Sequence, residues 1–107
     1  QVITNLVKNA FDAMPKGGKL DIIIDDNETD VVFKIQDTGI GISPDDLDKI
    51  FEPFYTTKGI GKGTGLGLAT AYGIVKMHKG KISVESNNDP AKGGTGTIFT
   101  LILPRFQ

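Results

Sequence analysis

The chain contains no cysteine, a single histidine and no long run of apolar residues. The lack of cysteine excludes disulfides and thiolate metal sites, and His78 alone cannot form a zinc cluster or a histidine-based triad. No apolar stretch approaches the roughly 20 residues of a membrane-spanning helix, and no secretory signal opens the chain. The net charge of −1 gives no general attraction to nucleic acid or to anionic membranes. We therefore expect a soluble, intracellular chain.

The 107 residues suffice for one compact domain, and their 38% hydrophobic and 23% charged content is typical of a globular fold. Glycine is in excess, at 14 residues, and five of these fall between positions 59 and 67. The first residues, "QVITNLVKNAFDAM", indicate a helix with no capping signal before it. We therefore expect a single domain over residues 1–107 that was cut from a longer protein on its N-terminal side.

Periodicity along the chain predicts an alternation of helices and strands. The predicted helices cover 2–14, a short segment within 43–51, and 65–80; the predicted strands cover 19–25, 31–37, 81–86 and 96–103. Ser43 and Pro44 form the start signal of the short helix, and Gly80 is the predicted end of the third helix. This order predicts a two-layer α/β sandwich, with one mixed, mostly antiparallel sheet and helices packed on one face.

Asp37 ends the second predicted strand, in phase with three apolar residues of that strand. A carboxylate in such a position needs hydrogen-bond donors. In one interpretation it only caps the next turn, by accepting from the amides of Gly39 or Ile40. In the other, it lies beside backbone that Gly39 and Gly41 let approach closely, and it accepts from the amino group of a flat purine.

The first helix carries a polar face of Asn5, Lys8, Asn9 and Asp12. A solvated surface would explain Lys8. Two asparagines one turn apart are less easily explained, because asparagine is a poor helix former. An amide oxygen is a suitable ligand for Mg²⁺ that phosphates already neutralise in part, and Asn9 is the residue we assign to this role.

The glycine-rich stretch "KGIGKGTGLGLAT" (58–70) contains no Walker A motif, and the turn after Asp37 has proline where a Rossmann fingerprint needs its third glycine. "GTGLGLA" instead runs directly into a helix, whose first backbone amides and dipole favour an anion. Lys58 and Lys62 flank the stretch and add positive charge. A flexible linker, the alternative, would be expected to contain serine rather than Leu66 and Leu68.

Taken together, five ordered motifs make the sequence resemble one family. "NLVKNAFDAM" is similar to an N box, "DTGIGIS" to a G1 box, "FEPFYTTK" to an F box, "GKGTGLGLA" to a G2 box and "GGTGTIF" to the last glycine box. These motifs resemble the catalytic and ATP-binding domain of two-component sensor histidine kinases. The wider group includes gyrase, the Hsp90 chaperones and the MutL proteins. The resemblance implies the Bergerat ATP-binding fold, with ATP and Mg²⁺ as ligands.

The resemblance also implies roles for individual residues. Asn9 would bind Mg²⁺, Asp37 would read adenine, and Thr97 would support the base through water. Asn5, Asn9 and Lys58 are the implied catalytic residues. The implied nucleotide-binding set is Asn5, Lys8, Asn9, Asp12, Asp37, Gly39, Gly41, Ile42, Phe51, Tyr55, Thr56, Thr57, Lys58, Gly63, Thr64, Gly65, Leu66, Gly67, Leu68 and Thr97. For Phe51 and Phe54 of the F box, a role as ordinary core aromatics is an equally good interpretation.

Two positions distinguish branches of the group. Hydrolytic members typically carry glutamate four residues before the metal-binding asparagine, where this chain has Asn5. The resemblance therefore favours a histidine kinase over a gyrase-, Hsp90- or MutL-like ATPase. The alternative of a non-catalytic nucleotide-binding module is disfavoured because Asn9, Asp37 and the glycines of the lid are all present. Asp12 stands where many histidine kinases have a basic residue, which shifts the expected phosphate contact to Lys58, with Lys8 as a second candidate.

The function that follows from the resemblance is transfer of the γ-phosphate of ATP to a histidine on a partner dimerisation domain. From there the phosphate would pass to an aspartate of a response regulator receiver domain. His78 lies near a helix end without an acidic neighbour, so we interpret it as a surface residue. The parent protein would be a homodimer, and this domain would be cytoplasmic, without contact to nucleic acid or membrane.

Overall fold

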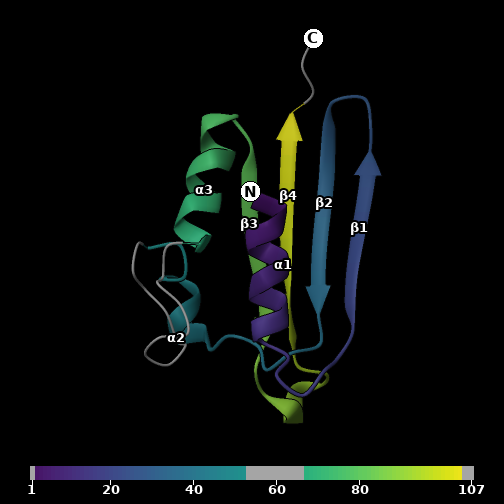
Figure 1. Ribbon diagram of the computed structural model, residues 1–107, viewed down its shortest axis with the longest axis vertical. Helices are drawn as coiled ribbons and strands as arrows, with labels where there is room; N and C mark the ends of the chain where they lie inside the picture. The colour runs from purple at the N-terminus through teal and green to yellow at the C-terminus, as the bar shows by residue number, and fades with distance from the viewer. Residues whose placement is uncertain (1, 53–66, 105–107) are drawn as a thin grey trace.

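The computed structural model describes residues 2–52 and 67–104. Its elements, in chain order, are α1 (Val2–Asp12), β1 (Leu20–Asp26), β2 (Asp30–Asp37), α2 (Pro44–Leu47), α3 (Gly67–Met77), β3 (Lys81–Asn87), the 3-10 turn η1 (Pro90–Lys92) and β4 (Gly96–Pro104). One layer is a sheet, and the helices α1 and α3 lie on one side of it (Figure 1). The predicted order of elements and the two-layer architecture are confirmed.

The four strands pair in the order β1-β2-β4-β3. Each of these pairings is antiparallel, so the sheet is antiparallel throughout the described residues. The last strand, β4, therefore lies between β2 and β3 rather than at an edge. This insertion places Asp37, at the end of β2, directly opposite Thr97, near the start of β4.

The core lies between the helical layer and the facing side of the sheet. The largest fully buried side chains are Leu6 of α1, Ile35 of β2, Val75 of α3 and Leu101 of β4. Buried and half-buried residues alternate along β4, as expected for a strand with one face on a core. Because Asp37 and Thr97 continue this buried face, both side chains point to the helical side of the sheet.

The helix α1 ends at Asp12, two residues before the predicted end. The Ala13 amide is shared between the carbonyls of Asn9 and Ala10, and the Met14 amide bonds to Phe11, so the chain tightens there. Phe11, near this end of the helix, is 61% exposed although its side chain is apolar. The helices also leave one part of the sheet uncovered (Figure 1).

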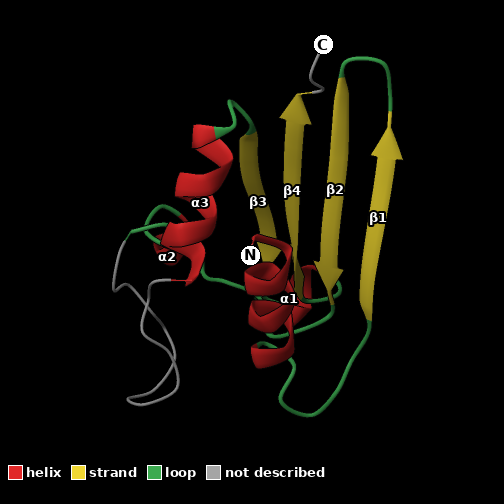
Figure 2. Ribbon diagram, turned by 45° about the horizontal axis from the view of Figure 1, so that its top comes forward, coloured by secondary structure: helices red, strands yellow, loops and turns green. Residues whose placement is uncertain are grey.

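That uncovered part is the edge strand β1. Its residues Asp21–Asp26 are all exposed, although Ile22 and Ile24 share the sheet face on which the helices pack. Their exposed fractions are 48% and 60%. In Figures 1 and 2, α1 and α3 lie over the β4 and β3 side of the sheet, away from β1.

The ends of the two later helices follow local chemistry. At α2, the Ser43 hydroxyl accepts from the Asp46 amide and Pro44 occupies the first turn, as predicted. The helix α3 stops at Met77, three residues before Gly80. Lys79, with φ of 60°, adopts the left-handed conformation that usually ends a helix. Gly80 is needed for another reason, because a Cβ there would lie 2.7 Å from the Ile102 carbonyl oxygen.

Several element ends meet at one end of the molecule, the lower end in Figure 1. The helix α1 and the strands β2 and β3 finish there, β4 begins there, and α3 starts toward it. We call this the site end. Among the described residues, no helix is long and apolar enough to cross a membrane.

Candidate functional site

Asp37 is the central polar residue of the site end. Its side chain is 5% exposed, and its Oδ1 accepts a hydrogen bond of 2.8 Å from the Gly39 amide. The Thr97 amide, on the neighbouring strand, also donates to this carboxylate. The turn-capping interpretation of Asp37 is thus correct as far as Gly39 is concerned. The Ile40 amide donates instead to the Ala13 carbonyl, at 3.0 Å.

Burial raises the pKa of the Asp37 carboxyl above its usual value of 3.8, against the lowering effect of the Gly39 and Thr97 amides. A carboxylate has about four acceptor positions, so two backbone amides leave capacity for a further donor. A nearly buried acceptor with remaining capacity favours a ligand that brings an N–H group. Asp37 can therefore cap its turn and bind a donor at the same time.

Beside Asp37, two hydroxyls form a contact that the sequence did not predict as a unit. Thr97 is 3% exposed, and its Oγ1 lies 2.7 Å from the Oγ of Ser86 on β3. Ser86 also accepts from the Ile42 amide, at 2.7 Å, and thereby ties the loop after Asp37 to the sheet. The only signal for Ser86 in the sequence is its phase, because it continues the inward positions of Ile82 and Val84.

The glycines of the loop after Asp37 are required by close backbone packing. A Cβ on Gly39 would collide with the backbone of Ala13, at the end of α1. A Cβ on Gly41, whose φ is +79°, would collide with the carbonyl of Asn87, at the end of β3. This packing holds the loop against both layers of the fold. That Gly41 also makes room for a base stays a prediction.

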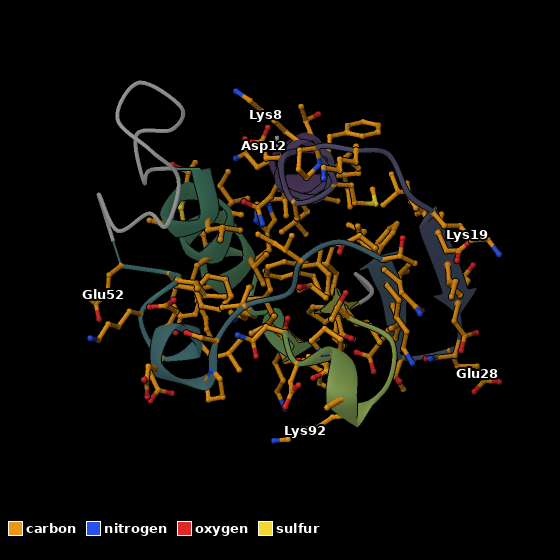
Figure 3. All side chains as sticks on the ribbon, turned by 90° about the horizontal axis from the view of Figure 1, so that it is seen from below. Lys8, Asp12, Lys19, Glu28, Glu52 and Lys92 are labelled. Atoms are coloured by element: carbon orange, nitrogen blue, oxygen red, sulfur yellow. The ribbon has the colours of Figure 1, made fainter. Side chains whose placement is uncertain are left out.

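The predicted polar face of α1 divides in two. Asn5 and Asn9 are half-buried, whereas Lys8 and Asp12 are exposed. Figure 3, seen from the site end, shows Lys8 and Asp12 together on the side of α1 that faces away from the sheet. The two asparagine residues thus remain partly exposed. The metal role of Asn9 stays a prediction.

Phe51 packs as a core aromatic. It lies against the cluster of Leu6, Ile35, Ile50 and Phe99, and its ring centroid is 5.1 Å from that of Tyr72 and 6.4 Å from that of Phe99. Of the two interpretations of this residue, the structure supports packing. Ile42 and Leu68, both predicted to contact nucleotide, also pack against the same cluster.

Much of the predicted nucleotide-binding loop lies outside the described residues. This holds for the F-box residues Phe54 and Tyr55, the lysines Lys58 and Lys62, and the following set: Thr56, Thr57, Gly63, Thr64, Gly65 and Leu66. Gly67 is the first residue of α3. The helix of the predicted anion site is therefore confirmed. The role of the preceding loop in that site remains a prediction.

The histidine and the other carboxylates in the described part of the chain do not form a competing metal site. Within residues 2–52 and 67–104, no three histidine, cysteine, aspartate or glutamate side chains are grouped so that they could hold a metal ion. His78 is exposed just after α3, and its Nδ1 lies 2.8 Å from the Ile74 carbonyl oxygen. Its interpretation as a surface residue at a helix end is confirmed.

The described residues thus combine two features at one end of the fold. Asp37 and Thr97 supply oxygen atoms on the inward face of adjacent strands, which suits the donor edge of a flat ligand. The first amides of any α-helix have no partner within the helix, and the start of α3 also carries the positive end of the helix dipole; both suit an anion. A nucleotide has both a base with an amino group and phosphates.

Comparisons with known proteins identify a family that the whole chain matches. The family described as "Histidine kinase-, DNA gyrase B-, and HSP90-like ATPase" matches the chain over residues 1–107. Sensor kinase CckA of Brucella abortus (strain 2308) is 47% identical over 120 residues, which cover 98% of this chain and 12% of CckA. The chain thus spans a small part of this curated relative.

Solved structures also match the fold of the chain. A mycobacterial sensor histidine kinase, MprB, matches with a TM-score of 0.82 and 30% identity, covering 96% of this chain and 69% of that one. Full-length ShkA, solved in complex with AMPPNP, gives a TM-score of 0.80 and 28% identity, covering 96% of this chain and 20% of that one. The chain therefore belongs to the histidine kinase-, DNA gyrase B- and HSP90-like ATPase family, as a catalytic and ATP-binding domain of the sensor histidine kinase type.

Proposed function

We propose that this domain binds ATP with Mg²⁺ at the site end and donates the γ-phosphate to a histidine on a dimerisation domain of its parent protein. A nitrogen of that imidazole would bond to the γ-phosphorus, the bond to the ADP oxygen would break, and the imidazole would release its proton. The phosphate would then pass to an aspartate of a response regulator. The observation that carries this proposal is the nearly buried Asp37, paired with Thr97 at the end of a sensor-kinase fold.

In this proposal Asp37 recognises adenine. Its carboxylate is already held in place by the Gly39 and Thr97 amides, so it needs no reorganisation to accept from the 6-amino group. A purine with a carbonyl at that position would bring acceptor against acceptor. Such a mismatch leaves buried polar groups unpaired and is strongly disfavoured.

The phosphates would lie toward the start of α3 and the polar side of α1. Backbone amides at Gly67 and in the preceding loop would bind them, with Lys58 as the assigned cation. Asn9 fits Mg²⁺ because an amide oxygen is a hard ligand and Mg²⁺ keeps most of its other sites for phosphate and water. Bound there, the ion would neutralise charge on the phosphates, and transfer would depend mainly on positioning.

The acceptor histidine is not His78. That residue follows the last turn of α3, whereas the proposed phosphate site lies at its first turn. Eleven helical residues separate the two by about 16 Å, at 1.5 Å per residue. A histidine must therefore come from another domain, which supports the proposed partnership in a homodimeric parent protein.

Asn5 supports transfer rather than hydrolysis. It lies one turn before Asn9 on α1, at the position where hydrolytic relatives were expected to carry glutamate. An amide cannot act as a general base, because it has no proton-accepting form near neutral pH. We therefore propose that the isolated domain binds ATP but hydrolyses it slowly, which disfavours a gyrase- or Hsp90-like ATPase.

The first test is calorimetry with ATP and Mg²⁺ on the wild type and on Asp37→Asn. Removing the carboxylate replaces an acceptor by a mixed donor and acceptor, so affinity should fall about tenfold or more. Asp45→Asn, on the exposed side of α2, is the matched control and should bind as the wild type does. Undiminished binding by Asp37→Asn would remove the adenine role.

The second test is phosphotransfer. The domain is mixed with labelled ATP, with and without the dimerisation domain of its parent protein. Label should appear on the dimerisation domain, while the domain alone and its His78→Ala variant should remain equally unlabelled. Binding of ATP without any transfer would instead favour the alternative of a non-catalytic nucleotide-binding module. In the proposed function, the domain would act in the cytoplasm, without contact to nucleic acid or membrane.

A further inference from the structure

Ser86 makes three short polar contacts where β3, β4 and the loop after Asp37 meet. Its Oγ lies 2.7 Å from the Ile42 amide nitrogen, 2.9 Å from the Gly96 carbonyl oxygen and 2.7 Å from Thr97 Oγ1. Ser86 is half-buried and stands opposite Thr97 in the pairing of β3 with β4. It therefore adjoins the proposed adenine site without belonging to the residues assigned to it.

Counting protons fixes the direction of these bonds. A serine hydroxyl has one proton to donate and two lone pairs to accept with. The Ile42 amide can only donate to Ser86, and the Gly96 carbonyl can only accept from it. For all three contacts to be hydrogen bonds, the Ser86 proton must go to Gly96 and Thr97 must donate its own proton to Ser86.

This arrangement determines what Thr97 offers to a ligand. With its proton engaged by Ser86, the Thr97 hydroxyl presents lone pairs in every other direction. Thr97 lies opposite Asp37 on the same face of adjacent strands. The site would then present two acceptors side by side and no hydroxyl donor from Thr97.

We infer that Ser86 is a positioning residue for nucleotide selectivity: it holds the Thr97 hydroxyl as an acceptor, so the site selects a 6-amino purine over a 6-oxo purine. This inference rests on the proposed ATP-binding function and extends it to a residue on β3. Ser86 acts through Thr97 and has no contact of its own with the base. Without Ser86, the Thr97 hydroxyl could rotate and donate to a 6-oxo group.

The test compares the affinities for ATP and for inosine triphosphate, which carries a carbonyl at position 6 and a hydrogen on N1. Calorimetry on Ser86→Ala should show the ratio of the two affinities falling about three- to tenfold, the range that one reoriented hydrogen bond produces. Ser83→Ala is the matched control, because Ser83 lies on the opposite, exposed face of the same strand. Its ratio should equal that of the wild type.

A double-mutant comparison separates positioning from general support. If Ser86 acts through the Thr97 hydroxyl, adding Ser86→Ala to Thr97→Val should leave the ratio of affinities unchanged. Ser86→Cys keeps the shape of serine but is a poor acceptor, so it should lower the ratio as alanine does. It replaces Ser86→Ala if circular dichroism shows that the alanine variant is unfolded.

Two results would overturn the inference while leaving the proposed function intact. In one, both affinities fall by the same factor in Ser86→Ala, which would show that Ser86 only supports the loop. In the other, Ser86→Ala changes the ratio as strongly in the Thr97→Val background as in the wild type. A wild-type chain that binds neither nucleotide would instead overturn the proposed function, and this inference with it.

Discussion

A nearly buried carboxylate at the end of a strand must be matched by donors, and Asp37 shows how this match also prepares a binding site. Two backbone amides hold it, one from its own turn and one from the next strand. They offset only part of the desolvation, since the pKa of Asp37 is still raised. The residue therefore destabilises the unliganded fold when ionised, and a ligand that donates to it would relieve part of this penalty.

The raised pKa of Asp37 has a predicted sign in unfolding experiments. Between its ordinary value of 3.8 and the raised value, the folded chain binds more protons than the unfolded chain. The contribution of Asp37 to the free energy of unfolding must then decrease as pH rises through this window, and it stays lower above it. Asp37→Asn lacks this titration.

Urea unfolding of both proteins from pH 3.5 to 8 tests this sign. The stability of the wild type relative to Asp37→Asn should increase as pH is lowered through the window and should be constant above it. Relative stability that instead falls on acidification would show that the amide hydrogen bonds outweigh burial.

Among the helices, the end of α3 illustrates how tertiary packing changes the use of a residue. Gly80 was expected to end the helix. Its lack of a side chain instead allows it to pack closely against the Ile102 carbonyl. The left-handed conformation falls on Lys79, where it costs about 1–2 kcal/mol because a Cβ crowds the following carbonyl. The strain at Lys79 is retained because shifting the left-handed residue to position 80 would remove Gly80 from its position beside β4.

Lys79→Gly should therefore raise the free energy of unfolding, by about 0.5–1 kcal/mol after the added freedom of the unfolded chain is subtracted. The matched control is Lys76→Gly, the same change inside α3, which should lower it by up to about 1 kcal/mol. Thermal or urea unfolding measures both. A loss of stability in Lys79→Gly as large as that in Lys76→Gly would contradict the strain at Lys79.

The helices cover the sheet unevenly. The helices bury one side of the sheet from β3 across to β2, while β1 keeps Ile22 and Ile24 exposed on that same face. Two residues in equivalent inward positions should therefore differ greatly in their contribution to stability. Leu101 on β4 is 1% exposed and fully surrounded, whereas Ile24 on β1 is not.

Leu101→Ala should lower the free energy of unfolding by about 2–5 kcal/mol, because it leaves a cavity in the core. Ile24→Ala, at the exposed edge, should change it by about 1 kcal/mol or less, mostly through strand propensity. Urea unfolding of the two variants under the same conditions provides the comparison. Equal losses would mean that β1 is covered in solution by something that the described residues do not include.

Several features of this protein follow from local patterns in its chain. The alternation that put Asp37 in phase with a buried face, the cap at Ser43 and the order of the motifs could all be predicted, because each depends on residues only a few positions apart. The glycine-rich stretch 59–67 belongs with them as a motif. Its predicted contacts lie outside the described residues, so its role in phosphate binding remains a prediction.

Other features were decided only when distant segments came together. The insertion of β4 between β2 and β3 brings Thr97 to Asp37 and Ser86 to Thr97, and the packing of the helices leaves β1 exposed. No local pattern specifies these contacts, because strand order is set by the total burial that competing arrangements achieve. The sequence by itself thus predicts the residue types of the site. The direction of the hydrogen bonds around Thr97 is decided only by the tertiary structure, because it depends on which strands pair.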